Sequence, residues 1–251
     1  MMNTNRRKLS KIMILHYFKL TFRSLLFLSA LILYIYNMLH HTNSSFSGFD
    51  ENKIILTVIW CIFVVEMILR FIPSSIESMG CQKQFKQNYH PTGLAKDQAE
   101  ILSSRRTWTV ITAWFALNGL IGILYYTHVI DYGILILISL AYSVCDMICI
   151  LFFCPFQTWF MKNRCCCTCR IYNWDFAMMF TPLIFVKTFF ARTLVILSIA
   201  LFIRWEYALH RHPEYFSEKT NSSLSCRECQ EKLCHHKTQL KSFWDRQKKL
   251  S

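Results

Sequence analysis

The run GILILISLAYSVCDMICILFF, Gly133–Phe153, decides the fold of this chain. Its only charged side chain is Asp146, and it contains no proline. An α-helix needs about 20 mainly apolar residues to cross a hydrocarbon core of about 30 Å. A continuous run of this length and composition therefore predicts a transmembrane helix.

Four other apolar runs have the same character. They are Leu25–Leu39, extended backward by Ile12–Leu20, then Ile54–Ile72, Trp108–Tyr126 and Phe176–Ile203. The short connection Thr127–Tyr132 predicts a tight turn between the third and fourth runs, and Pro182 interrupts the last one. We expect an all-α polytopic integral membrane protein with about five transmembrane helices and a small cysteine-rich module.

The composition agrees with a membrane bundle. Of 251 residues, 53% are hydrophobic and 17% are charged, whereas soluble domains carry about 25% charged residues. The net charge of +13 lies at the ends of the apolar runs. Such residues are attracted to anionic inner-leaflet lipids by about 1 kcal/mol each. We therefore expect the bilayer and its anionic lipids as partners and no nucleic acid.

Lys and Arg gather in the N-terminal segment, in the loop 74–106 and in the loop 162–175. Cytoplasmic loops carry such an excess, so we predict a multi-pass protein of the cell membrane with a cytoplasmic N-terminus. Five spans place the tail on the opposite face, although the tail is itself basic. If Phe176–Val186 is instead a re-entrant half-helix that turns at Pro182, the tail is cytoplasmic.

These observations divide the chain into seven segments. In order, we expect a basic, partly amphipathic N-terminus (1–24), two transmembrane helices (25–72), a cytoplasmic loop with an interfacial helix from about Thr92 (73–107), a transmembrane hairpin (108–153), a cysteine-rich linker (154–175), a fifth transmembrane helix with its extension (176–212) and a polar, basic tail (213–251). The interfacial helix has an equal alternative, a simple linker. Glycosylation sequons occur at Asn43 and Asn221.

Two cysteine clusters are the sharpest chemical signal in the sequence. The candidate metal ligands are Cys154, Cys165, Cys166 and Cys169 in the linker, and Cys226, Cys229, Cys234 and His235 or His236 in the tail. A two-residue gap between cysteines lets both sulfurs reach one zinc ion. The tail also supplies a complete Cys3His set. Zinc is the first choice and an iron–sulfur cluster the second.

Each cluster also has an alternative without metal. Juxtamembrane cysteines of the linker are typical sites of palmitoylation. Cysteines of the tail pair as disulfides if they face an oxidising compartment.

Polar side chains inside the apolar runs form a second set of candidates. They are Glu66, Arg70, Asn118, Asp146, Lys187 and Arg192. Glu66 and Arg70 are four residues apart, on one helix face, which predicts an ion pair. Lys187 and Arg192 are the candidate counter-charges for Asp146 and Glu66. Because charges at this depth are costly, the set either holds the bundle together or lines a proton or ion path.

Three further residues stand at helix ends. Glu206 and His210 are four apart and can share a metal ion or a proton, while Asp175 is a candidate N-cap of the fifth helix at the membrane interface.

Three functions follow from these patterns, and the sequence leaves open whether the chain is an enzyme. The leading hypothesis is a membrane protein that binds a metal through clustered cysteines and serves redox or metal-dependent chemistry at the membrane face. The alternatives are a small transporter or channel with a path lined by intramembrane acids, and a membrane adaptor that binds a protein partner through its basic tail.

Overall fold

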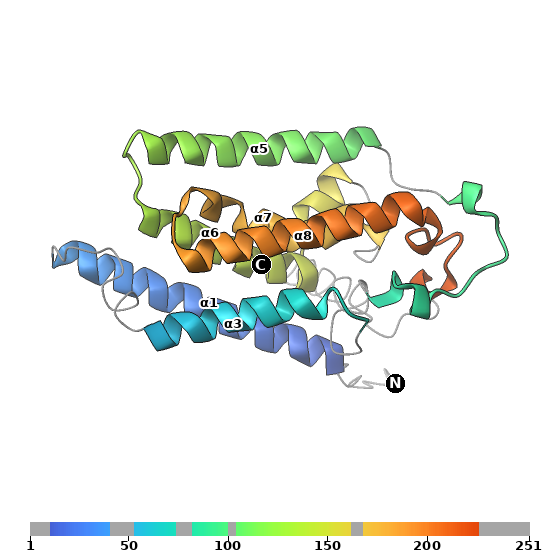
Figure 1. Cartoon of the computed structure of the whole chain (residues 1–251), viewed down its shortest axis with the longest axis horizontal. Helices are drawn as coiled ribbons and strands as arrows, with labels where there is room; N and C mark the ends of the chain where they lie inside the picture. The colour runs from blue at the N-terminus through green and yellow to red at the C-terminus, as the bar shows by residue number, and fades with distance from the viewer. Residues whose placement is uncertain (1–10, 41–52, 74–81, 100–103, 162–167, 226–251) are drawn as a thin grey trace, which may run out of the picture.

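A computed structural model describes residues 11–40, 53–73, 82–99, 104–161 and 168–225. Within these residues the chain is all-α. The long helices lie side by side along one axis (Figure 1): α1 (Lys11–Leu39), α3 (Lys53–Leu69), α5 (Ser104–Tyr126), α6 (Tyr132–Leu151) and α8 (Phe189–Arg211). The short helix α7 (Asp175–Phe180) is packed among them.

Three of the long helices are apolar and long enough to cross a membrane. They cover Ile12–Leu39, Arg105–Tyr126 and Tyr132–Leu151. Large apolar side chains also face outward on the other two, for example Ile54 on α3, 77% exposed, and Ile196 on α8, 67% exposed. Exposed apolar surface of this extent marks contact with lipid. The structure therefore supports a multi-pass membrane protein, as the sequence predicted.

The α5–α6 connection agrees with the predicted turn. Helix α5 ends at Tyr126 and α6 begins at Tyr132. His128 adopts a positive φ of 59°, and the carboxylate of Asp131 accepts the Ile134 N–H as the N-cap of α6.

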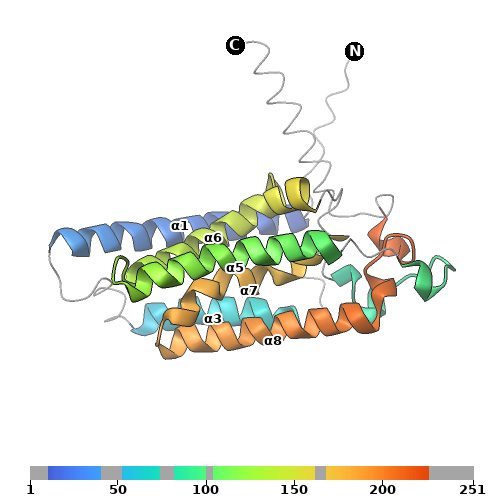
Figure 2. The same ribbon diagram turned by 90° about the horizontal axis from the view of Figure 1, so that it is seen from above.

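The predicted fifth span is wrong, because the structure divides it into two passes along the bundle. The first pass consists of η5 (Arg170–Trp174), α7 and η6 (Thr181–Phe185). Pro182 stands at the start of η6, where its missing N–H interrupts the α-helical hydrogen bonds. Thr188 then caps α8 by accepting the Ala191 N–H. Figure 2 shows α7 running between α5 and α8, with α8 returning alongside it.

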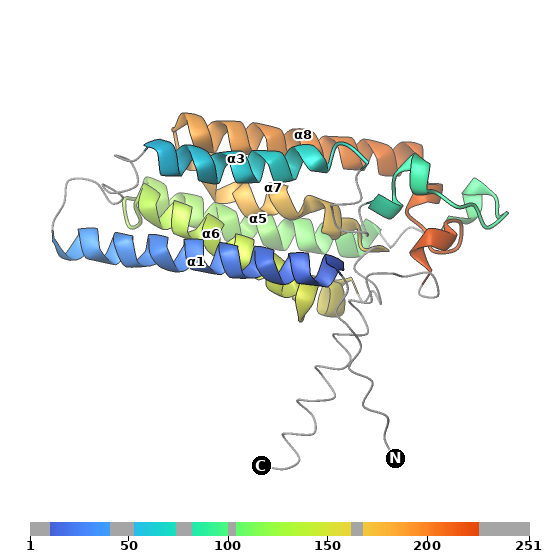
Figure 3. The same ribbon diagram turned by 90° about the horizontal axis from the view of Figure 1, so that it is seen from below.

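The return of α8 brings the beginning of the tail to the loop that precedes α5. Figure 3 shows residues 82–99 and 213–225 together at the end of the bundle where α1 begins and α8 ends. Ser222 N–H donates to the His90 carbonyl at 2.9 Å, and Thr92 N–H to the Thr220 carbonyl at 3.2 Å. The expectation that the tail lies opposite loop 74–106 is therefore wrong for residues up to Ser225.

Asn221 holds this docked tail. Its side chain is 0% exposed, and its Nδ2 donates to the carbonyls of Lys83 and Tyr215, both at 3.0 Å.

The expected interfacial helix does not form between Thr92 and Ala99, where only the 3-10 turn η2 (Lys96–Gln98) occurs. The reason is that the backbone of Pro91 and Thr92 pairs with the tail. The other sequon, Asn43, lies outside the described residues.

Candidate functional site

Arg23 joins three helices inside the bundle. This α1 residue is 2% exposed, and its guanidinium lies 2.7 Å from the Glu66 carboxylate of α3 and 3.1 Å from the Asp146 carboxylate of α6. It also donates to the Ser143 carbonyl at 3.1 Å. Lys19 adds a second contact to Glu66 at 3.6 Å. The buried Arg23 guanidinium therefore compensates two half-buried acids, and Lys19 adds to the compensation of Glu66, which limits the cost of keeping these carboxylates out of water.

Arg70 forms a second ion pair next to this one. Its guanidinium lies 2.6 Å from the Asp175 carboxylate of α7 and 4.8 Å from the centre of the Phe176 ring. Asp175 is thus a buried ionic partner at the first residue of α7 and not an N-cap at the interface, because the N-cap position belongs to Trp174. Its Oδ1 still accepts the Phe176 N–H at 2.9 Å.

These contacts correct the predicted pairing of the intramembrane charges. The structure pairs Glu66 with Arg23 and Arg70 with Asp175, partners that the sequence did not predict for them. Lys187 and Arg192 are both exposed and are not the counter-charges. Asn118 is buried and donates to the Trp114 carbonyl of its own helix at 3.0 Å. The counter-charge that sequence reasoning missed is Arg23, which the sequence pattern assigned to the basic N-terminal flank.

Glu206 and His210 also differ from expectation. Glu206 accepts hydrogen bonds from the Arg170 guanidinium and from the Trp174 indole, the latter at 2.7 Å, whereas His210 is exposed. The carboxylate therefore fastens η5 to α8, and the expected Glu–His metal or proton pair does not form.

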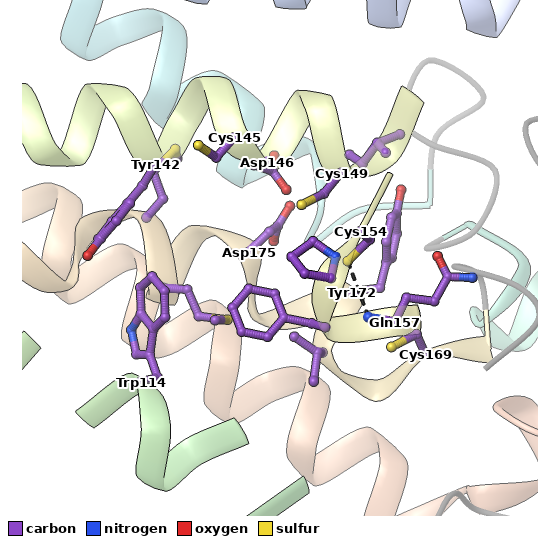
Figure 4. Close-up of a pocket in the computed structure, with 16 residues that line it drawn as sticks. Trp114, Tyr142, Cys145, Asp146, Cys149, Cys154, Gln157, Cys169, Tyr172 and Asp175 are labelled. Carbon is purple, nitrogen blue, oxygen red and sulfur yellow. Dashed lines mark hydrogen bonds between the residues drawn. The ribbon is translucent and has the colours of Figure 1, made fainter. Parts of the chain in front are cut away.

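A cavity of about 310 Å³ opens between α5, α6, α7 and the start of the linker. Figure 4 shows Asp146 and Asp175, two of the three acids that pair with Arg23 and Arg70, at its wall together with Cys149 and Cys154. The side chains of Cys145 and Cys169 complete a set of four thiols around it. Apart from these groups the wall is almost entirely carbon, and it includes the aromatic rings Trp114, Tyr142, Phe156 and Tyr172.

Two of the thiols at this cavity are neighbours. Cys149 lies in the last turn of α6 and Cys154 three residues after its end. Their side chains lie next to each other at the cavity wall (Figure 4), and the Gln157 N–H points to the Cys154 sulfur at 3.4 Å. The structure thus brings together two cysteines of which the sequence interpretation had chosen only Cys154. The sequence contained a signal for Cys149, because this residue follows Asp146 by three positions and so lies on nearly the same helix face.

No group of three His, Cys, Asp or Glu side chains is placed to hold a metal ion among the residues that the structure describes. Of the predicted ligands, Cys154 and Cys169 are described, and both line the cavity. Cys165 and Cys166, like Cys226, Cys229, Cys234, His235 and His236, lie outside the described ranges. Zinc at either cluster stays a prediction, as does an iron–sulfur cluster.

The fold and the site together define a class: a multi-pass membrane protein with paired charges in its interior and a thiol-lined cavity beside them. Comparisons with family models, with curated proteins and with solved structures found no match to this chain.

Proposed function

We propose that this protein binds a small lipid-soluble molecule in the cavity and acts on it through thiol redox chemistry. The observation that carries the proposal is the meeting of four cysteine side chains at one apolar cavity inside a membrane bundle. Its volume of about 310 Å³ lies within the range of small-molecule sites, which are concave and mostly apolar with a few polar groups. The proposal keeps the redox role expected from the cysteines and leaves metal binding to the two clusters.

The charge network supports a structural role for the intramembrane acids. Glu66 and Asp146 share Arg23, and Asp175 pairs with Arg70. A path for ions needs acids that exchange partners with a passing solute, whereas these acids are each held by a buried guanidinium. Of the other groups of the expected path, Asn118 donates a hydrogen bond within its own helix and Lys187 is exposed. The transporter alternative therefore receives less support than a binding cavity.

Photolabelling tests the proposal directly. The full chain in lipid nanodiscs is irradiated with an alkyl diazirine probe, and the labelled peptides are identified by mass spectrometry. We expect label on cavity residues such as Met178 and Tyr172, and competition by excess unlabelled apolar ligand.

A matched pair of variants separates the cavity from the lipid-facing surface. Ile171→Trp fills the cavity wall and should remove most of the competable label. Ile196→Trp adds the same side chain to the exposed face of α8 and should leave the label unchanged. Equal, non-competable labelling in both variants would contradict the proposal.

A further inference from the structure

Cys149 and Cys154 are five residues apart and line the same cavity. Their side chains lie next to each other across the end of α6 (Figure 4). The connection between them contains the end of α6: the helix stops at Leu151, and Phe152 is its C-cap. Phe153 and Cys154 have no regular secondary structure. A short irregular connection allows the small side-chain rotations that a disulfide geometry requires.

The surroundings of this dithiol indicate the kind of molecule that exchanges electrons with it. Both sulfurs line the cavity, whose exposed wall is mostly carbon and contains four aromatic rings beside Asp146 and Asp175. Aromatic side chains favour offset or edge contacts with another flat ring. An oxidant that reaches the thiols from the bilayer must be apolar, flat and able to take two electrons. A lipid-soluble quinone has these three properties.

We infer that Cys149 and Cys154 form a redox-active dithiol that reduces a lipid-soluble quinone bound in the cavity, an inference that rests on the proposed function. In the net step, the two S–H bonds break and one S–S bond forms. The two electrons and two protons pass to the quinone, whose carbonyl oxygens become the hydroxyl groups of a hydroquinone. The dithiol is oxidised by two electrons and the quinone is reduced by two, so the step balances without a further reactant.

The experiment uses the full chain in nanodiscs, reduced, freed of reductant and kept anaerobic. A short-chain ubiquinone is added, and its reduction is followed by ultraviolet absorbance. The thiols are then alkylated and mapped by mass spectrometry. We expect one quinone reduced per chain and a disulfide between Cys149 and Cys154. Cys149→Ser and Cys154→Ser should each slow quinone reduction by at least about tenfold, because a disulfide needs both thiols.

Cys61→Ser is the matched control. This cysteine is exposed on α3 and free, and it is absent from the cavity wall, so the variant should reduce quinone at the rate of the unchanged protein. Equal rates in Cys149→Ser and the unchanged protein would overturn the inference. Disulfides formed only among other cysteines, or covalent quinone adducts in place of a disulfide, would overturn it as well.

A quinone that carries a photoactivatable azide distinguishes this inference from the function on which it rests. Labelling of cavity peptides with the thiols still reduced means that the cavity binds its ligand and the dithiol inference fails. Absence of competable cavity labelling by both this quinone and the alkyl probe means that the proposed function itself fails.

Discussion

Arg70 of α3 pairs with Asp175 of α7 across 2.6 Å, although Glu66 stands one turn away on the same helix. The pair therefore connects two helices where the sequence pattern indicated a contact within one. It also places the start of α7 against α3, and Asp175 itself lines the cavity. A buried pair between helices fixes their register, because a shift of either helix separates the charges.

A comparison of two double-mutant cycles checks this pairing. Removing one partner of a buried pair costs about 3–5 kcal/mol, whereas removing both costs less than the sum. We expect Arg70→Ala and Asp175→Asn to be strongly non-additive in the free energy of unfolding, and Arg70→Ala and Glu66→Gln to be nearly additive. Loss of helical signal during detergent-induced unfolding gives both values. The reverse order of coupling would restore the contact within α3.

Arg23 is predicted to be the most sensitive charge of the bundle. Arg23→Ala leaves the carboxylates of Glu66 and Asp146 with one cation fewer, so we expect a loss of at least about 3–5 kcal/mol. Adding Glu66→Gln and Asp146→Asn should recover part of this loss. Arg192→Ala on the exposed face of α8 is the control and should change unfolding little. Equal effects of the two arginine substitutions would contradict a buried role for Arg23.

The sequence identifies most of the membrane-crossing helices because each is a continuous apolar run. It also predicts the turn at His128, because the connection between the third and fourth runs is short. It does not identify the pairing of charges, since Arg23 looks like a basic flank until α1 is placed against α6. The two passes after Tyr172 depend on Pro182 and on the Thr188 cap, and hydropathy alone merges them into one span. The cavity could not be predicted from the sequence either, because it forms where three helices and the linker meet in space.

Asn221 is predicted to remain unglycosylated and to hold the tail. Its amide is fully buried and donates two hydrogen bonds, so an attached glycan has no room in this fold. Asn221→Ala leaves two buried carbonyls without their donor, at a cost of about 1–3 kcal/mol for each unsatisfied group. Trypsin cleavage after Lys219 should then be faster than in the unchanged protein. Ser225→Ala serves as control, and an equal rate in both variants would contradict this role.

Zinc binding by the tail cluster is tested on the whole protein. Cys226, Cys229 and Cys234 with His235 or His236 make a closed four-ligand set of the kind found in structural sites. We expect metal analysis of protein purified without chelator to find one zinc ion that is lost in Cys229→Ser and retained in Cys61→Ser. Zinc that survives Cys229→Ser would move the site to the linker cluster, and a protein without zinc would favour disulfides.

The last prediction concerns the two ends of the chain. The beginning of α1, the loop before α5, the start of the linker and the docked tail lie at one end of the bundle (Figures 1 and 3). The N-terminal segment, the loop 74–106, the linker and the tail hold most of the basic residues and connect to helices at that end, so a cytoplasmic tail agrees with the positive-inside rule. We expect that end to be cytoplasmic. Epitope tags at both chain termini should be detected only after cells are permeabilised, whereas a tag inserted after His128 should be detected on intact cells. A C-terminal tag exposed on intact cells would support the five-span arrangement instead.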